Sequence, residues 1–225
     1  MPGPRIALIH ATPLAMEPIQ SAFQRLWPQA RRMNLLDDSL SADRAEAGRL
    51  TDAMVRRFED LARYAQGTGC NGILFTCSAF GPAIEAAARA TGLPTLKPNE
   101  AMFEQALALH QPGRVLRLGL VATFQASLPS MSAELEQLAA GRGLQVAVET
   151  VFVPEAMDDL ARGDAADHHR KIANASHALR DCDAVMLAQF SMAAARTETQ
   201  AHFACPVLSS PDCAVQALLQ RMSDA

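Results

Sequence analysis

The chain repeats itself, and this internal repeat constrains the fold more than any other feature of the sequence. Three segments of the first half recur in the same order in the second half, at offsets of 111, 112 and 112 residues: RIALIHAT (5–12) with RLGLVAT (117–123), GILFTC (72–77) with AVMLAQ (184–189), and LPTLKPNEA (93–101) with CPVLSSPDC (205–213). One match alone would be weak, because apolar runs resemble one another. Three in order at a nearly constant offset predict two copies of one structural unit.

Each copy alternates short apolar runs with amphipathic stretches. The runs show no polar alternation, which is typical of parallel strands covered on both faces. Strands are expected at 5–10, 31–36, 72–76 and 94–97, and again at 115–121, 144–152, 183–188 and 206–208. Helices are expected at 15–27, at 42–66, from 79 and from 99, and then at 128–140, 155–181, 190–202 and the C-terminus.

This alternation predicts an α/β protein of two pseudo-symmetric, flavodoxin-like domains with parallel sheets, related by internal duplication. The first domain is expected at 1–110 and the second at 111–208. The C-terminal helix, at 209–225, is expected to pack back on the first domain.

Polar and thiol side chains stand where predicted strands end. Ligands of parallel sheets bind outside the carboxyl ends of the strands. Four residues occupy such positions, two in each copy: Thr12, Cys77, Thr123 and Gln189. We therefore expect the active site in a cleft between the two domains.

Composition and charge exclude several classes of function. A net charge of −4 without a basic patch argues against nucleic acid as a partner. No apolar run is long enough for a membrane span and no signal peptide is evident, so a cytoplasmic protein without a membrane partner is expected. Five cysteines without a CxxC pair indicate reduced thiols. Neither G-x-G-x-x-G nor G-x-x-x-x-G-K-[ST] occurs, which leaves nucleotide binding by those routes unsupported.

One segment, DAADHHRK (164–171), is rich in side chains that can bind metals. Adjacent histidines on a helix point in different directions, and the usual i, i+4 pair of ligands is missing. We therefore expect a solvated helix face here and no metal site.

Cys77 lies between Thr76 and Ser78, at the junction of a predicted strand and helix. Unpaired N–H groups and the helix dipole favour the thiolate there, so the pKa of Cys77 is expected below the free value of about 8.5. The same N–H groups and hydroxyls can bind a carboxylate. This arrangement suits proton transfer at the carbon next to a carboxylate, through an enediolate held by fixed donors. The alternative is a small buried cysteine without a chemical role.

The sequence resembles the aspartate/glutamate racemase superfamily, which includes hydantoin racemases, maleate isomerases and arylmalonate decarboxylases. The segments that carry the resemblance span nearly the whole chain in order: RIALIHAT, GILFTCSAF, GLVATF and PVLSSP. The resemblance implies an enzyme without cofactor or metal that acts on a small amino or carboxylic acid. It also implies that Cys77 is catalytic. The substrate-binding residues it implies are Thr12, Ser78, Ala79, Thr123, Phe124 and Ser191. Homodimers are common in the family.

Two-base members of that superfamily place one cysteine from each half beside the substrate, and this chain has Gln189 at the second position. Glutamine has no titratable proton but can orient a carboxylate by hydrogen bonds. A single thiol suits a decarboxylase, which protonates one face of an enediolate. It also suits a cis–trans isomerase that adds the thiol to a double bond. Racemisation needs a second base, for which His10 is the candidate in reach, although a histidine bonded to a loop is the simpler interpretation.

We therefore expect a cofactor-independent racemase or isomerase with Cys77 as its acid–base group. A single-cysteine decarboxylase of malonate-type acids or a cis–trans isomerase is the first alternative. The second is a two-lobed sensor that binds a small acid without transforming it. Aromatic residues near three strand ends hint at a less polar substrate than aspartate: Phe80, Phe124 and Phe190.

Overall fold

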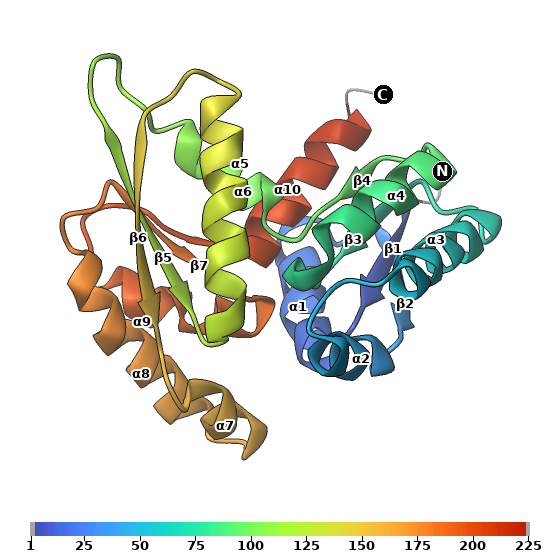
Figure 1. Cartoon of the computed structure of the whole chain (residues 1–225), viewed down its shortest axis with the longest axis horizontal. Coiled ribbons are helices and arrows are strands. Elements are labelled where there is room, and N and C mark those ends of the chain that lie inside the picture. The colour runs from blue at the N-terminus through green and yellow to red at the C-terminus, as the bar shows by residue number, and fades with distance from the viewer. Residues whose placement is uncertain (1–2, 224–225) are drawn as a thin grey trace. The chain divides into compact units, whose positions relative to one another are not determined.

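The computed structural model describes residues 3–223, with all side chains except those of residues 126 and 223 (Figure 1). Contacts divide the chain into two compact units, 1–100 with 214–225 and 101–213. The predicted bounds of 1–110 and 111–208 put the division later in the chain than these contacts do. Among the described residues, every helix is too short or too polar to span a lipid bilayer.

The first unit contains a four-stranded parallel sheet of order β2-β1-β3-β4. Its strands are β1 (Arg5–His10), β2 (Arg31–Leu36), β3 (Gly72–Phe75) and β4 (Thr95–Leu96). Its helices are α1 (Met16–Leu26), α2 (Ser39–Ala47), α3 (Asp52–Gly67) and α4 (Gly81–Thr91), with 3₁₀ turns η1 (Pro13–Ala15) and η2 (Ser78–Phe80).

The second unit repeats this sheet with the order β6-β5-β7-β8, again all parallel. Its strands are β5 (Leu116–Ala122), β6 (Val146–Phe152), β7 (Ala184–Leu187) and β8 (Val207–Ser209). Its α-helices are α5 (Glu100–Leu107), α6 (Leu128–Ala140), α7 (Ala156–Ala161), α8 (Ala165–Ser176) and α9 (Arg196–Gln200). The 3₁₀ turns are η3 (Gln125–Ser127), η4 (His177–Leu179) and η5 (Phe190–Ala195). Helix α10 (Ser210–Ser223) starts in the second unit, and from Ala214 on it belongs to the first.

Strand register supports the internal duplication. Ile9 pairs with Phe75 in the first sheet, and the residues 112 positions later, Val121 and Leu187, pair in the second. A side-chain contact recurs as well, because the Arg5 N–H donates to Asn71 Oδ1 and the Arg117 N–H donates to Asp183 Oδ2, both at 2.8 Å.

The same register corrects one detail of the sequence alignment. Thr12 precedes η1 as Phe124 precedes η3, each as the N-cap residue. Thr123 is therefore equivalent to Ala11, and its predicted pairing with Thr12 is wrong by one residue. The sequence comparison matched Thr12 with Thr123 because both segments end in threonine, whereas the structure matches Thr12 with Phe124.

The long helix predicted at 42–66 is wrong, because two helices occupy this region. Gly48 ends α2 with φ of 62°, a left-handed conformation that glycine adopts without strain. Thr51 then starts α3, since its side chain accepts a hydrogen bond from the Met54 N–H. The helical region predicted at 155–181 is divided in the same way, with Gly163 at φ 85° and Asp164 capping α8.

The core of the first unit places η2 directly behind the end of β3. Helices α3 and α4 pack against each other (Figure 1) and share a core with β1 and β3. Phe58 of α3 stacks on Phe75 at 5.1 Å and contacts Phe80 at 4.8 Å between ring centroids. Burying these three rings fixes the backbone on both sides of Cys77.

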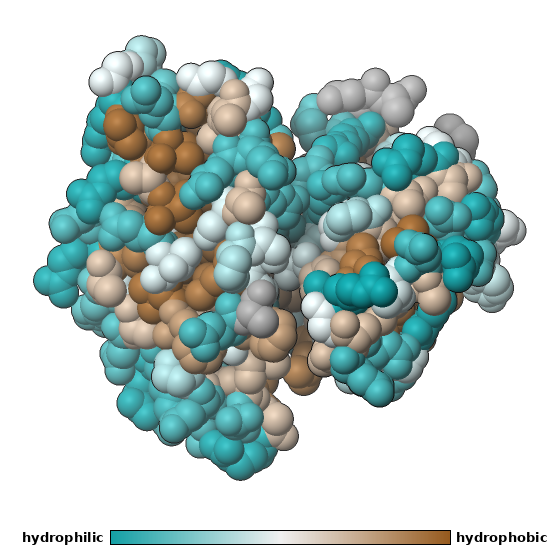
Figure 2. All heavy atoms as spheres, viewed as in Figure 1, coloured by the Kyte–Doolittle hydropathy of each residue, from teal (hydrophilic) through white to brown (hydrophobic). Residues whose placement is uncertain are grey.

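Edge strands depart from the predicted covering of both faces. In β2 most side chains are exposed, and in β6 most are half-buried. Figure 2 shows apolar side chains at the surface over the region of β6. The expectation of full burial holds for the inner strands β3 and β7, where every residue is buried.

Candidate functional site

Cys77 lies two residues beyond the last residue of β3, after Thr76, and directly precedes η2. The last ladder bond runs from the Thr76 N–H to the Ile9 carbonyl at 3.0 Å. Cys77 then adopts an extended backbone and caps the three-residue turn η2. The residue as a whole is partly exposed, whereas Phe80 at the end of the same turn is fully buried. The thiol itself is largely removed from water, near the carboxyl end of an inner strand.

The predicted lowering of the Cys77 pKa is wrong. Burial raises the pKa of this thiol, and the nearby Ala79 N–H and Ser41 hydroxyl oppose the rise without cancelling it. A 3₁₀ turn follows Cys77, and α4 begins only at Gly81, so the sulfur is not at the end of an α-helix. The thiol is therefore the predominant form at neutral pH.

Ser41 is a site residue that sequence reasoning missed. It lies on α2, where its hydroxyl donates to the Ala11 carbonyl at 2.6 Å, and it opposes the rise in the pKa of the Cys77 thiol. The predicted helix began at residue 42 and left Ser41 outside it. The glycine and threonine that separate α2 from α3, Gly48 and Thr51, were the signal that could have revealed a short helix here.

His10 is enclosed at the end of β1 with an exposed fraction of 1%. Its Nε2 lies 3.1 Å from Asn34 Oδ1, which also accepts a hydrogen bond from the Gln20 amide at 2.8 Å. Because a carbonyl oxygen can only accept, Nε2 carries the proton and Nδ1 accepts from the Thr76 hydroxyl at 2.9 Å. Burial lowers the pKa of His10, so the ring is neutral at pH 7. These contacts favour positioning of the strand ends, and a direct proton transfer by His10 gains no support from them.

The other predicted residues of the first unit lie at the carboxyl ends of β1 and β3, which pair directly. Thr12 caps η1, with its hydroxyl accepting from the Leu14 N–H at 3.4 Å. Ser78 and Ala79 form the start of η2 and are partly exposed. The fold thus brings Thr12, Cys77, Ser78 and Ala79 to one end of the sheet.

In the second unit, Gln189 occupies the position equivalent to Cys77 and is held by its own contacts. Its Oε1 accepts from the Thr123 N–H at 2.9 Å and lies 3.4 Å from the Thr123 hydroxyl. Its Nε2 donates to Ser127 Oγ at 3.0 Å, and the Ser127 hydroxyl donates to the Phe124 carbonyl at 2.7 Å. Both ends of the amide are therefore engaged. Ser127, which is buried, was missed because nothing in the sequence marks it.

Two further predicted residues of the second unit lie at its strand ends. Ser191 is in η5, with its hydroxyl 3.9 Å from the sulfur of Met157. Phe124 is 54% exposed. Phe80 and Phe190 are buried and fill the core, so of the three aromatic residues only Phe124 faces solvent.

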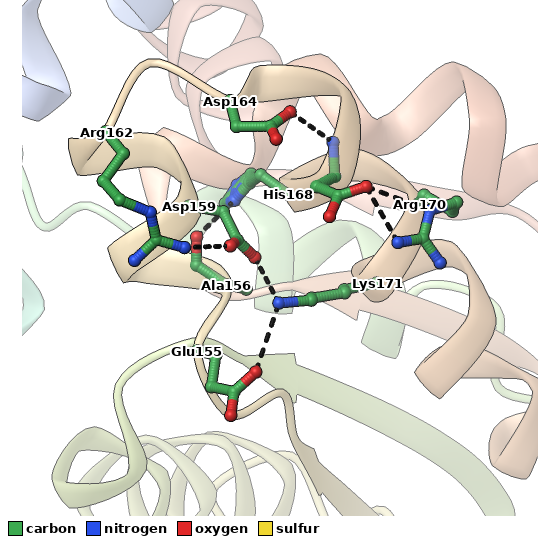
Figure 3. A network of polar contacts seen from close by, with 9 residues as sticks. Glu155, Ala156, Asp159, Arg162, Asp164, His168, Arg170 and Lys171 are labelled. Atoms are coloured by element: carbon green, nitrogen blue, oxygen red, sulfur yellow. Dashed lines mark hydrogen bonds and ion pairs between the residues drawn. The ribbon is translucent and has the colours of Figure 1, made fainter.

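Two residues of the segment 164–171, His168 and Lys171, contact α7 (Figure 3). Asp159 is 3% exposed and pairs with Lys171 and Arg162, both at 2.6 Å. His168 is fully buried, with its Nδ1 3.2 Å from the Ala156 carbonyl. The predicted solvated face is therefore wrong for His168, because α7 covers that side of α8.

Comparisons with known proteins bear on the whole chain. A sequence model of the Asp/Glu/hydantoin racemase family matches residues 8–218. A search of functionally curated proteins gave no significant match.

Solved structures of similar fold include decarboxylases and racemases. A glycine-to-cysteine mutant of arylmalonate decarboxylase is 21% identical, with 96% of this chain and 92% of that chain covered and a TM-score of 0.68. An aspartate racemase homologue from Pyrococcus horikoshii OT3 is 15% identical, with 99% and 100% covered and a TM-score of 0.72. A glutamate racemase from Bacillus anthracis is 14% identical, with 100% and 83% covered and a TM-score of 0.70. At these identities the likeness establishes the fold.

Proposed function

The chain belongs to the Asp/Glu/hydantoin racemase family, and from this premise we propose that it is an enzyme that transfers a proton at the carbon next to a carboxylate of a small acid. Cys77 is the acid–base group in this proposal. The observation that carries it is the position of this thiol just beyond the carboxyl end of β3, directly before the turn η2 that begins with Ser78. In the second unit the equivalent position holds an amide without a titratable proton.

The protonation state of the thiol selects among the reactions of such a site. Because burial raises the pKa of Cys77, the group enters the reaction as an acid. An acid suits the protonation of an enediolate better than the removal of a proton from a stable α-carbon. A decarboxylase of this family has to protonate an enediolate. A disubstituted malonate forms such an enediolate when it loses CO2, and it is therefore the proposed substrate class.

In the proposed reaction, the bond between the α-carbon and one carboxylate breaks and CO2 leaves. The bonding electrons remain on the rest of the acid as an enediolate, whose oxygens accept hydrogen bonds from Thr12, Ser78 and backbone N–H groups. The Cys77 S–H gives its proton to the α-carbon. Water returns a proton to the thiolate and completes the cycle.

Racemisation is the second candidate, because racemases of aspartate and glutamate are among the similar structures. It needs the thiol as a base and a second group for the other face of the α-carbon. The fixed amide of Gln189 and the enclosed ring of His10 both count against this reaction. The racemase expected from the sequence therefore follows the decarboxylase in our proposal.

Proton NMR in D2O tests the two reactions together, with substituted malonates, maleate, aspartate and glutamate as the panel. Decarboxylation with deuterium at the α-carbon, lost in Cys77→Ser and kept in Cys205→Ala, supports the decarboxylase. Deuterium exchange into aspartate or glutamate without loss of CO2 supports the racemase instead. Saturable binding of an acid with no change in any spectrum would overturn both and favour a sensor.

A further inference from the structure

Helix α7 has six residues and is attached to the second unit largely by polar contacts. The two residues that it buries are Ala156 and Asp159, which contribute a methyl group and a carboxylate. Asp159 pairs with Lys171 of α8 at 2.6 Å, and the Lys171 ammonium also lies 3.3 Å from Glu155 (Figure 3). Because little apolar area holds α7 on α8, its attachment depends on the charges at their interface.

Glu155, which directly precedes α7, has a strained backbone conformation. Its φ is 62°, in the left-handed region that residues with a β-carbon rarely adopt. Among the described residues it is the one non-glycine residue with a positive φ. Such conformations persist only where surrounding contacts maintain them. The ion pair with Lys171 is one of these contacts, so the strain favours release of α7 once its contacts with α8 weaken.

His168 of α8 is a buried titratable group at this interface, with an exposed fraction of 0%. Its Nδ1 lies 3.2 Å from the Ala156 carbonyl, which can only accept, so Nδ1 carries the proton of the neutral ring. Nε2 is then the unprotonated nitrogen, and it is buried without a hydrogen-bond partner in the part of the chain that the structure describes. A second proton has to bind at Nε2, where the charged ring has neither water nor an acceptor while α7 covers it.

The charges around His168 do not compensate for a proton at Nε2. Asp159 is the anion that acts on this ring, and its carboxylate already pairs with Lys171 and Arg162, both at 2.6 Å. The His169 ring, with its centroid 5.5 Å from that of His168, opposes a further positive charge. Burial and His169 lower the pKa of His168, and Asp159 raises it without cancelling them.

The other charged groups on α8 and on the elements packed against it are paired or exposed. Glu149 of β6 pairs with Arg117, and Arg196 of α9 pairs with Asp212. The turn η5 has no titratable side chain. On α7, α8, α9 and η4 the exposed groups are Asp158, Asp164, Arg170, His177 and Glu198, and Asp167 pairs with Arg170. The balance at His168 is therefore set by burial, Asp159 and His169.

We propose that α7 is a pH-sensitive flap that protonation of His168 releases from α8. With α7 in place, Nε2 stays unprotonated and Nδ1 donates to the Ala156 carbonyl. At acidic pH, Nε2 takes up a proton from water, the charged ring becomes hydrated as α7 leaves, and Glu155 relaxes from its left-handed conformation. No bond between heavy atoms forms or breaks in this change.

Release of α7 changes the surroundings of Ser191 at the carboxyl ends of the strands. The sulfur of Met157, in α7, lies 3.9 Å from the Ser191 hydroxyl in η5. The effect on catalysis rests on the proposed function and on the predicted role of Ser191 in substrate binding. Below pH 6 the KM for a substrate should then rise with little change in kcat, and His168→Gln should remove this rise.

Amide hydrogen exchange between pH 7.5 and pH 5, followed by mass spectrometry and divided by the intrinsic rate at each pH, tests the release itself. Peptides covering 156–163 are expected to lose protection by up to about tenfold for each pH unit below about 6.5, since release takes up one proton. Their protection should also stay below the value set by the free energy of unfolding, which urea denaturation gives at each pH. Protection equal to that value throughout would mean that α7 opens only when the protein unfolds, and the proposal would be wrong.

A pair of variants assigns the effect to one histidine. His168→Gln keeps a side chain that can donate to the Ala156 carbonyl but has no titratable proton, so protection at 156–163 should no longer depend on pH. His169→Gln is the matched control one residue along α8 and should keep the dependence. A pH dependence that survives His168→Gln would overturn the proposal.

The imidazole ¹⁵N signals of His168 in the unmodified protein give a second test that does not depend on the folding of a variant. The ring should carry its proton on Nδ1 at pH 7.5 and should titrate in step with the loss of protection at 156–163. A ring that becomes charged while 156–163 stay protected would contradict the release. Neither measurement needs a substrate, so its outcome is distinct from a failure of the proposed function, which would appear as turnover that survives Cys77→Ser.

Discussion

The two units have the same sheet and differ in what stands at the ends of its inner strands. In the first, His10 and Thr76 bond each other beside Cys77. The residues at the same register in the second unit are Ala122 and Ala188, both buried, beside Gln189. There the polar contacts come from Thr123 and Ser127 instead. Duplication has thus preserved the backbone and its hydrogen-bond register while the chemistry of each copy diverged, because strand pairing does not depend on which side chain follows the strand.

The largest effect is expected when the Cys77 thiol, which the second unit lacks at the equivalent position, is removed from the first unit. Cys77→Ser is expected to lower turnover by about 10²- to 10⁴-fold, since a serine hydroxyl is far too weak an acid to replace the thiol. The free energy of unfolding should change little. Turnover of a substrate from the NMR panel and urea unfolding are the two measurements. If Cys77→Ser turned over the substrate as fast as the unmodified protein does, the acid–base group would lie outside the first unit.

Gln189 should matter for stability in its own unit. Gln189→Ala leaves the buried Thr123 N–H without its acceptor and removes the amide N–H that donates to Ser127 Oγ. The expected cost is about 1–3 kcal/mol in the free energy of unfolding, from urea denaturation. Gln125→Ala, an exposed residue of the adjacent turn η3, is the control. A cost no larger than that of the control would mean that the amide is not fixed in solution.

Each unit also buries one histidine whose pKa burial lowers, His10 and His168. As the pH falls, the unfolded chain takes up the proton first. Stability is therefore complete above the ordinary pKa of about 6.5 and falls below it toward the lowered values, by up to about 1.4 kcal/mol per pH unit for each histidine.

Urea unfolding between pH 7.5 and pH 5 measures this slope. His10→Gln and His168→Gln should each reduce it. A slope that one of the two variants does not reduce would show that the histidine of that unit takes up its proton as readily in the folded protein as in the unfolded chain.

Arg57 of α3 pairs with Asp37, which precedes α2, and with Asp43 in α2. Loss of these two ion pairs should have the smallest effect on stability. The pairs are partly exposed, so Arg57→Gln is expected to cost less than about 1 kcal/mol. Hydrogen exchange at 39–47 should nevertheless become faster, and so should alkylation of Cys77. Arg63→Gln, which removes an exposed pair on the same helix, is the control. Unchanged exchange at 39–47 would show that Arg57 does not contribute to the attachment of α2.

Most of the strands were predictable because β3 and β7 are continuous apolar runs and recur at one offset. The single helix predicted at 42–66 was wrong because its apolar periodicity continues through Gly48 and Thr51, and only the backbone reveals the left-handed cap that ends α2. Ser41 and Ser127 were not predictable, since each acquires its partner from a segment more than twenty residues away.

The sequence by itself determined the duplication, the parallel α/β architecture and the position of the thiol at a strand end, because local apolar patterning and the repeat carry these features. The state of that thiol was decided only by the tertiary structure. Its pKa depends on how far the surrounding chain removes it from water, on a turn that is 3₁₀ instead of α-helical, and on a serine that another helix brings to it. Burial and long-range hydrogen bonds arise from packing, which no local stretch of residues specifies.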